Sequence, residues 1–585
     1  MYDLVIRNGK LIDGTGGPAR VADVAVKDGL IAAVGADLGP ALRTIDATGL
    51  IVTPGFVDMH THFDAQATWD PYLTPSSWHG VTTVVMGNCG VGFAPAAPDK
   101  HDWLIGLMEG VEDIPGSALA EGIRWGWETF PEYMSALDAQ PHAIDFALLV
   151  PHDPLRVYVM GHRGVLGETA TPDDIAKMRD LLREALLAGA VGFSTGRSDN
   201  HRSADGRATP AAEATIAELS GIAGAFEGLP FGVVQAVSDF DIDAGPARFD
   251  PEFDVIEAMA RATGGRPTSV SLMQRDAASD QWERILARCE KANREGTRIH
   301  VQVAARAIGV LLGLQATFHP FVGFPSYKRI AHLPLEERVR EMSSPDFKAR
   351  LLKESPEPLA GDGSAVPPLA DKLLANLDFV AMRLFRIGRD PQYEPNVRDS
   401  LYAEALSSGR PVLDVLYDAL LGDGGKELLY FPLFNYTGRN LDVVEQMLAH
   451  PLALAGLSDG GAHVGTVCDA SFPTFLLTHW ARDTKKIPIE RVVQMLTRRG
   501  AEFVGLTDRG ALLPGLRADI NILDLAGLRL SRPELRCDLP AGGRRLVQEA
   551  EGYIATLVAG EIIRDRNGLT GARPGRLAKP VAARG

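Results

Sequence analysis

The sequence predicts an α/β fold: a (β/α)8 TIM-like barrel plus a small β-sandwich domain built from both chain termini, with a long helical insertion before the eighth strand. Three observations predict it: strand-like runs at both ends of the chain, eight apolar or β-branched runs between them, and one long interruption before the last of these runs. Strand–helix alternation repeated eight times is typical of a parallel barrel. With 585 residues, the chain is long enough for one large domain and a smaller one.

The two ends of the chain show the same kind of pattern. Near the N-terminus, Val21–Val26 leads through the turn Lys27-Asp28-Gly29 into another apolar run, and Asp-Gly in this setting is a strong hairpin signal. Near the C-terminus, Ala518–Leu523 begins a second series of short apolar runs. We therefore expect residues 1–52 and 505–585 to meet in one small β-domain.

Residues 53–504 carry the alternation that predicts the barrel. One of its helices has strong boundary signals, with Thr171 as N-cap, Pro172 as first helical residue and Gly189 just past the end. The eight predicted barrel strands are Ile51–Val57, Val81–Met86, Phe146–Val150, Ala190–Ser194, Phe231–Ala236, Thr268–Met273, Arg298–Ala304 and Ala453–Leu457.

The interruption spans residues 305–451, between the seventh and eighth runs, and is far too long for a strand-to-helix connection. It contains several helix-like stretches. A lid that shapes the substrate site is the functional interpretation, and a surface excursion is the alternative. Because the loops that follow barrel strands lie on the active-site face, we favour the lid.

Composition excludes several classes of function. A formal net charge of −16 argues against nucleic acid or an anionic membrane as a partner. The four cysteines form no CxxC pair and no disulfide framework, which favours a reducing compartment. Charges near the N-terminus do not fit a secretion signal, and no apolar run approaches the roughly 18 residues that span a bilayer. We expect a cytoplasmic enzyme without a membrane partner, and a homo-oligomer is compatible with the sequence.

The strongest local signal is the segment Pro54-Gly55-Phe56-Val57-Asp58-Met59-His60-Thr61-His62. His60 and His62 are two residues apart on extended chain, so their side chains point to the same side. Their Cα atoms would be about 6–7 Å apart, and two imidazoles at this spacing can chelate one divalent ion. The alternative is that this His-x-His pattern occurs by chance in a surface loop. Its position at the end of the first predicted barrel strand argues against that alternative.

Two further residues follow other barrel strands. Cys89, just past the second run, is either a thiolate ligand of the same metal or an inert buried side chain. Asp459 follows the eighth run, where it either binds metal and takes a proton from water or only opens a turn into Gly460-Gly461. Its position after the eighth strand favours the catalytic role.

Taken in order along the chain, these motifs resemble the N-acyl-D-amino-acid deacylase branch of the amidohydrolase superfamily, over nearly the whole chain apart from the insertion. The segments that carry the resemblance are PGFVDMHTH (54–62), GVTTVVMGNCGVGFAP (80–95), AGAVGFSTG (188–196), SDGGAH (458–463) and TGARPGR (570–576).

The resemblance implies zinc as the metal. By carry-over, His60, His62 and Asp459 would be ligands of one metal position, and Cys89 a ligand of the more tightly held one. Asp459 would also be the general acid and base.

Three positions depart from the family pattern. The family places a histidine at the end of the fifth strand and another at the end of the sixth, where this chain has Gln235 and Leu272. Leucine cannot bind zinc, and a glutamine amide oxygen is a weak ligand for it. Gln274 stands where the family has a lysine that meets the substrate carboxylate, so a fixed positive charge is missing.

Three outcomes fit these departures, in order of preference. The first is one zinc ion held by the four donors, or by some of them with water. In the second, His152 or His201 takes over as a ligand, which leaves room for two ions. In the third, the site is degenerate and the protein is a binding protein without catalysis.

The sequence is therefore interpreted as a metal-dependent hydrolase of a carbon–nitrogen (amide) bond, similar to N-acyl-amino-acid deacylases, that acts on a small-molecule amide with metal-activated water. A cyclic amide or imide hydrolase on the same site is the alternative. The candidate substrate-binding residues are His152, Gln235, Gln274, Tyr327 and His463.

The missing lysine bears on the substrate. A buried carboxylate without a cation is costly, so an N-acyl amino acid requires a positive charge from elsewhere. The candidates for that charge are Arg197, Arg306 and Lys328.

Overall fold

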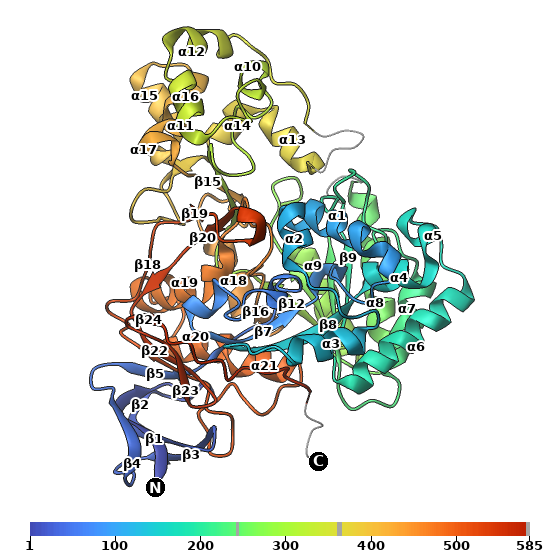
Figure 1. The fold of residues 1–585 in the computed structure, drawn as a ribbon, viewed down its shortest axis with the longest axis vertical. Coiled ribbons are helices and arrows are strands. Elements are labelled where there is room, and N and C mark those ends of the chain that lie inside the picture. Colours follow the sequence, from blue (N-terminus) through green and yellow to red (C-terminus); the bar gives the residue numbers. More distant parts are fainter. Residues whose placement is uncertain (241–244, 360–365, 581–585) are drawn as a thin grey trace.

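The computed structural model describes residues 1–240, 245–359 and 366–580. Within these ranges, eight parallel strands pair in one sheet whose neighbours follow the chain order (Figure 1). A backbone hydrogen bond of 2.7 Å from His62 N to Gly460 O, beside a parallel bridge between Thr61 and Gly460, joins the two edges of the sheet. The predicted barrel is thus confirmed. Its strands are β6 (Phe56–Asp58), β7 (Val81–Met86), β8 (Asp145–Pro151), β9 (Gly192–Arg197), β10 (Val233–Ser238), β11 (Thr268–Leu272), β12 (Ile299–Val303) and β16 (Ala453–Ala455).

Helices cover the outside of the barrel and come between its strands. In α6 (Pro172–Ala188), the Thr171 hydroxyl accepts from the Asp174 N–H, and Gly189 ends the helix in the left-handed conformation, as the sequence predicts. The other helices around the barrel are α1 (His101–Glu112), α2 (Gly116–Gly122), α3 (Phe130–Asp138), α4 (His152–Met160), α5 (His162–Val165), α7 (Ile216–Ala223), α8 (Phe249–Ala262), α9 (Gln281–Arg294), α18 (Asp442–Ala449), α19 (Phe472–Phe475), α20 (Ile489–Leu496) and α21 (Arg498–Phe503).

The two ends of the chain form a β-domain with its own apolar core, at the lower left of Figure 1. Its central pairing joins the termini, because Val52 of β5 lies opposite Ile522 of β17 in an antiparallel ladder. In the described part of the chain this sheet has nine strands: β1 (Tyr2–Leu11), β2 (Arg20–Lys27), β3 (Leu30–Gly35), β4 (Ala41–Asp46), β5 (Ile51–Pro54), β17 (Ile520–Leu523), β22 (Tyr553–Val558), β23 (Glu561–Asp565) and β24 (Gly568–Leu569). Two short ribbons accompany it: β18 (Arg529–Leu530) with β21 (Ala550–Glu551), and β19 (Glu534–Arg536) with β20 (Arg545–Val547).

The predicted first barrel strand, Ile51–Val57, divides at Gly55 into two strands of different sheets. β5 pairs with β17 in the terminal domain, and β6 pairs with β7 in the barrel. A Cβ at Gly55 would overlap the side chain of Thr82, so only glycine allows the chain to pass this point.

A buried charge cluster fastens the C-terminal segment to the barrel wall. Asp145, at the start of β8, is fully buried and accepts from Arg509 Nη1 at 2.6 Å and from Arg517 Nη2 at 2.9 Å. The backbone N–H of Arg576 donates to the same carboxylate. Three segments that are distant in sequence therefore meet on one carboxylate.

The insertion between β12 and β16 forms a separate body at the top of Figure 1, with an apolar core of its own. It is mostly helical, as predicted, and it also contains a small antiparallel sheet. The sheet consists of β13 (Ile308–Leu312), β14 (Phe385–Arg386) and β15 (Leu429–Phe434). The helices are α10 (Pro325–Lys328), α11 (Leu335–Met342), α12 (Pro345–Leu351), α13 (Pro368–Leu374), α14 (Leu377–Ala381), α15 (Leu401–Ser408), α16 (Val412–Leu420) and α17 (Gly422–Gly425). Among the described helices, none has the length and apolarity that crossing a membrane requires.

Candidate metal centre

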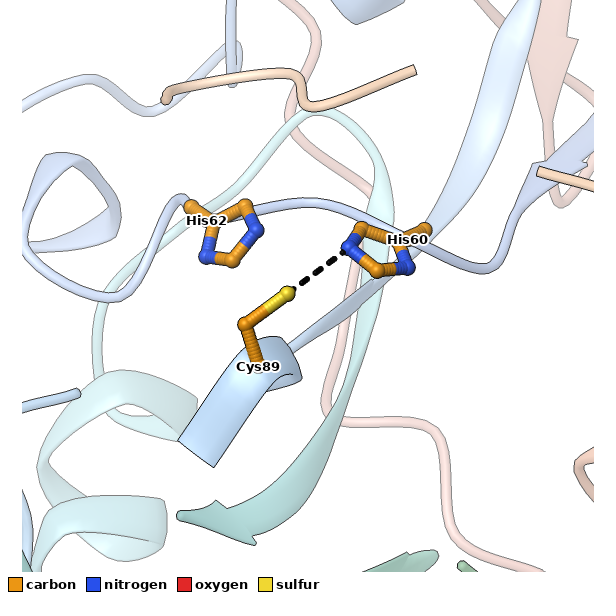
Figure 2. A group of neighbouring side chains, drawn as sticks. All are labelled: His60, His62 and Cys89. Atoms are coloured by element: carbon orange, nitrogen blue, oxygen red, sulfur yellow. Dashed lines mark hydrogen bonds between the residues drawn. The ribbon is translucent and has the colours of Figure 1, made fainter. Parts of the chain in front are cut away.

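Three of the predicted ligands meet at the carboxyl ends of the first two barrel strands (Figure 2). His60 and His62 follow β6 and are 1% and 2% exposed, and Cys89 follows β7 and is also buried. Cys89 Sγ lies 3.2 Å from His60 Nε2, and the three candidate ligand atoms all lie within 4.8 Å of one another. In Figure 2, the thiol of Cys89 points between the two imidazole rings.

Strained backbone holds Cys89 in this place. Its φ of 56° is left-handed, an uncommon conformation for a residue with a side chain, and it stands in a turn with Gly87 and Gly90, which also have positive φ. The N–H of Cys89 donates to Gln235 Oε1 at 2.8 Å, and the N–H of Gly90 donates to Ser194 Oγ at 3.0 Å. Neighbouring strands β9 and β10 thus fix the turn that presents the sulfur.

Asp459 lies beside these three residues, in the loop after β16, where the last barrel strand meets the first. Its Oδ1 lies 3.3 Å from His60 Nε2 and 3.8 Å from His62 Nε2. Its side chain is 17% exposed, more than the imidazole side chains beside it. Asp459 is therefore the donor that a substrate in solution can reach most directly.

The donor set fits zinc. Two imidazole nitrogens, one thiol sulfur and one carboxylate oxygen are ligand types that zinc takes in tetrahedral sites. His60 Nδ1 lies 2.5 Å from Gln302 Oε1, and since an amide oxygen only accepts, Nδ1 carries the proton and Nε2 presents a lone pair. Gln302 is held in turn because its Nε2 donates to Ser269 Oγ at 3.0 Å.

Glu112, which the sequence analysis missed, adds a carboxylate behind His62. It is the last residue of α1, only 1% exposed, and its Oε1 lies 3.1 Å from His62 Nδ1. Burial, and then the charges of Asp459 and Asp64, raise the pKa of Glu112 well above its ordinary value. The available signal was an acid beside the apolar residues Met108 and Val111, in a stretch that forms α1.

Charges of the same site shift the other donors. Burial lowers the pKa of His62 well below its ordinary value, and His60 and His463 add to this effect, so the imidazole is neutral and able to bind metal. Burial raises the pKa of the Cys89 thiol well above its ordinary value, and Asp459 and Glu112 raise it further. A bound cation would reverse this effect on the thiol, because metal coordination favours the thiolate.

The residues at the positions that depart from the family pattern make other contacts. Gln235 uses its amide oxygen to accept from Cys89, and its buried Nε2 has no partner among the described residues. Leu272 is fully buried in the apolar core. Within the described residues, His60, His62 and Cys89 form the one group with metal-ligand geometry, so the structure offers no second complete set there.

The two histidines considered as substitute ligands differ in their surroundings. His152 lies in the barrel wall, with Nδ1 3.0 Å from Thr195 Oγ1 and Nε2 3.1 Å from Glu218 Oε1, so both ring nitrogens are already engaged. His201 lies nearer the site, with its ring 6.4 Å from that of His463. Burial, and then His463, lower the pKa of His201 to about 4.

The remaining substrate-binding candidates lie apart from one another. Gln274 links the barrel to the insertion, because its backbone N–H donates to Asn435 Oδ1 at 2.7 Å and its Oε1 accepts from the N–H of Thr437. The hydroxyl of Tyr327 accepts from Arg338 inside the insertion. The His463 side chain is 32% exposed, and its Nε2 lies 3.9 Å from Glu112 Oε2. Of these three residues, His463 is the one beside the metal centre.

The three cations considered for a substrate carboxylate are all paired. The ion pairs are Arg197 with Glu252 at 2.5 Å, Arg306 with Asp469 at 2.9 Å, and Lys328 with Glu357 at 2.6 Å. Each charge is compensated within the protein, so none of the three stands free for a ligand.

Comparisons with known proteins agree with this site. A model described as "Amidohydrolase family" matches residues 43–355 and 430–564. The chain is 29% identical over 588 residues to D-aminoacylase from Alcaligenes xylosoxydans xylosoxydans, a match that covers 100% of this chain and 98% of the relative. It is 28% identical over 533 residues to N-acyl-D-glutamate deacylase from the same organism, covering 89% and 87% of the two chains.

Solved structures give the same result. N-acyl-D-glutamate deacylase from Bordetella bronchiseptica, solved with zinc and a phosphonate inhibitor, has a TM-score of 0.64 at 25% identity and covers 99% of each chain. D-aminoacylase itself has a TM-score of 0.65 at 24% identity, with 99% of this chain and 100% of that chain covered. These findings confirm the resemblance seen in the sequence motifs and the predicted class, a metal-dependent hydrolase of amide bonds. The chain belongs to the amidohydrolase family, in the branch that contains D-aminoacylase.

Proposed function

We propose that this protein is a zinc-dependent hydrolase of the amide bond in small N-acyl compounds, with one ion held by some of His60, His62, Cys89 and Asp459 together with water. The observation that carries the proposal is the convergence of these four donors at the barrel mouth, with His60 Nε2 3.2 Å from Cys89 Sγ and 3.3 Å from Asp459 Oδ1. The zinc complex of N-acyl-D-glutamate deacylase, a relative with the same fold, supports the choice of metal.

A zinc ion at this site would supply a Lewis acid that polarises the amide carbonyl and acidifies water. Asp459 then accepts a proton from the attacking water and delivers it to the leaving nitrogen as the carbon–nitrogen bond breaks. Gln302 holds the His60 imidazole with Nε2 toward the centre, and the carboxyl group of Glu112 lies 3.1 Å from Nδ1 of His62. The single carboxylate of Asp459, partly exposed at the mouth, performs both proton transfers.

The rival functions are a cyclic amide or imide hydrolase on the same atoms and a binding protein without catalysis. A protein that had lost catalysis would not need to retain all four donor side chains. The converging donors favour the hydrolase, because Gln302 supports His60, Glu112 lies behind His62, and Gln235 fixes the backbone of Cys89.

The experiment uses the purified full-length protein, its zinc content and a panel of amides. We expect about one zinc ion per chain, loss of hydrolysis after chelation, and recovery when zinc is added back. The panel holds N-acetyl and longer N-acyl amino acids of both D and L configuration, together with hydantoins and other cyclic amides. Asp459→Asn, loaded with zinc to the same level, serves as the matched inactive control. Hydrolysis of cyclic compounds alone would favour the first rival, and no turnover of any compound by zinc-loaded protein would contradict the hydrolase.

A further inference from the structure

A cavity of about 760 Å³ lies where the insertion meets the rim of the barrel. Insertion residues from Leu314 to Arg338 line one side, and the end of α1 and Gly465 line the other. The two bodies are in direct contact there, because Thr317 Oγ1 donates to Asp113 Oδ2 at 2.7 Å. Asp113 follows Glu112 in the chain, and Gly465 is two residues past His463, so the floor of the cavity adjoins the metal centre along the chain.

Arg338 of α11 brings an uncompensated positive charge to this cavity. The residue is only 7% exposed, and its Nη1 donates to Leu314 O at 2.8 Å and to the Tyr327 hydroxyl at 2.7 Å. Its Nε is buried without a hydrogen-bond partner. Over the described ranges, no carboxylate lies within ion-pair distance of Arg338, unlike Arg197 and Arg306. A buried guanidinium without an anion is costly, which points to an anion supplied by a ligand.

His319 supplies a second unused donor. Its Nδ1 accepts from the N–H of Phe321 at 3.2 Å, so the proton of the neutral ring is on Nε2. That Nε2 is buried and has no hydrogen-bond partner in the described part of the chain, while the ring packs edge to face with Tyr327 at 4.2 Å between centroids and the residue is 2% exposed. Burial, and then the charge of Arg338, lower the pKa of His319 to about 3, so the ring stays a neutral N–H donor.

The acidic groups of the cavity are already engaged or face solvent. Asp113 accepts from Thr317, and Glu109 is exposed and accepts from the N–H of Gly116. Arg544 is exposed at the rim and adds to the positive side. The other lining residues are mixed: Ile114, Leu314, Val322, Leu333 and Leu535 are apolar, and Gln315, Thr317 and His332 are polar.

We propose that this cavity binds a small organic carboxylate, and that Arg338 and His319 hold the carboxylate. The size of the cavity is that of a site for a drug-sized ligand, and guanidinium with imidazole N–H suits a carboxylate. The carboxylate belongs either to the amide substrate or to a separate small molecule. The first source rests on the proposed function, and there Arg338 would supply the charge that Gln274 lacks.

The binding experiment uses zinc-loaded full-length protein, benzoate as probe, and benzyl alcohol as its uncharged counterpart. We expect isothermal titration calorimetry to detect benzoate and to show much weaker binding of benzyl alcohol. Arg338→Gln should weaken benzoate binding at least tenfold, and Arg338→Lys, which keeps the charge, should weaken it less. The matched control is Arg340→Gln on the same helix, an exposed arginine that pairs only weakly with Glu337 and should bind benzoate as the wild type does.

Thermal melting of each variant separates loss of binding from loss of the fold. If Arg338 only braces Leu314 and Tyr327, the Gln variant melts lower but binds benzoate with the affinity of the wild type, and the proposal is overturned. Absence of benzoate binding by the wild type overturns it as well. These results do not depend on amide hydrolysis, so they remain distinguishable from a failure of the proposed function.

Kinetics identify the source of the carboxylate. If it is the substrate's own, Arg338→Gln lowers kcat/KM for an N-acyl amino acid at least tenfold, and leaves that for the corresponding N-acyl amine, which has no carboxylate, unchanged. If it belongs to a separate ligand, Arg338→Gln weakens benzoate binding and leaves the kinetics of both compounds unchanged. Either result, with weakened benzoate binding, supports the anion site.

Discussion

The carboxylate of Glu112 lies 3.1 Å from Nδ1 of His62, on the side of the ring that faces away from Cys89 and Asp459. A carboxylate in this position favours the tautomer with the proton on Nδ1, and it leaves Nε2 as the metal-binding atom. Gln302 has the corresponding position behind His60. The two imidazoles are therefore oriented by residues from α1 and β12, distant in sequence from the His-x-His motif.

We expect Glu112→Gln, which keeps the shape of the side chain but cannot become the carboxylate that a bound cation favours, to weaken zinc binding by roughly 10–100-fold. Competition with a chromogenic chelator measures the dissociation constant. Asp102→Asn, an exposed acid in the first turn of the same helix, is the control and should bind zinc as the wild type does. Equal affinity of the two variants would show that Glu112 does not support His62.

Gln302 offers a test with two substitutions. Gln302→Leu removes the acceptor for His60 Nδ1, so zinc affinity should fall by roughly tenfold or more, because the ring loses its fixed orientation. Gln302→Glu restores an acceptor, and its zinc affinity should stay within a few-fold of the wild type. The same chelator competition measures both. If the two variants were equally weak, the hydrogen bond to His60 would not be the cause.

Asp459→Asn should lower kcat by about 10²–10⁴-fold, the range for loss of a general acid–base group. The amide keeps an oxygen near His60 but cannot accept the proton from water. Zinc content, measured by mass spectrometry on the assayed sample, must be equal in variant and wild type for the comparison to hold. Activity that falls only in proportion to lost zinc would assign Asp459 a purely structural role as a ligand.

The buried charge cluster predicts a large effect on stability. Arg509→Met leaves Asp145 without one of its two arginine partners in a fully buried place, which should cost about 3–5 kcal/mol of the free energy of unfolding. Arg529→Gln is the control, since it breaks an exposed pair with Glu551 that should contribute no more than about 1 kcal/mol. Chemical denaturation followed by circular dichroism gives both values. A loss below about 1 kcal/mol for Arg509→Met would mean that Arg517 alone compensates Asp145.

Elements with local signals could be predicted from the amino-acid sequence. The alternation of runs predicted the barrel, the Thr171 cap and Gly189 predicted the ends of α6, and the His-x-His spacing predicted two imidazoles on one side of the chain. The alternation of side chains along extended chain and the capping of a helix both depend on residues close together in sequence. They can therefore be predicted from a linear sequence. The length of the interruption likewise predicted the insertion.

Which distant residues meet became clear from the folded structure. Gly55 divides a continuous apolar run between two sheets because Thr82, on a neighbouring strand, leaves no room for a side chain. His152 was a candidate ligand or substrate-binding residue from its place after the third strand, yet Glu218 and Thr195 engage both of its nitrogens. The contact between Glu112 and His62 and the unpaired charge of Arg338 likewise could not be predicted from the sequence. Burial and ion pairing depend on segments brought together by folding, so a pattern along the chain cannot reveal them.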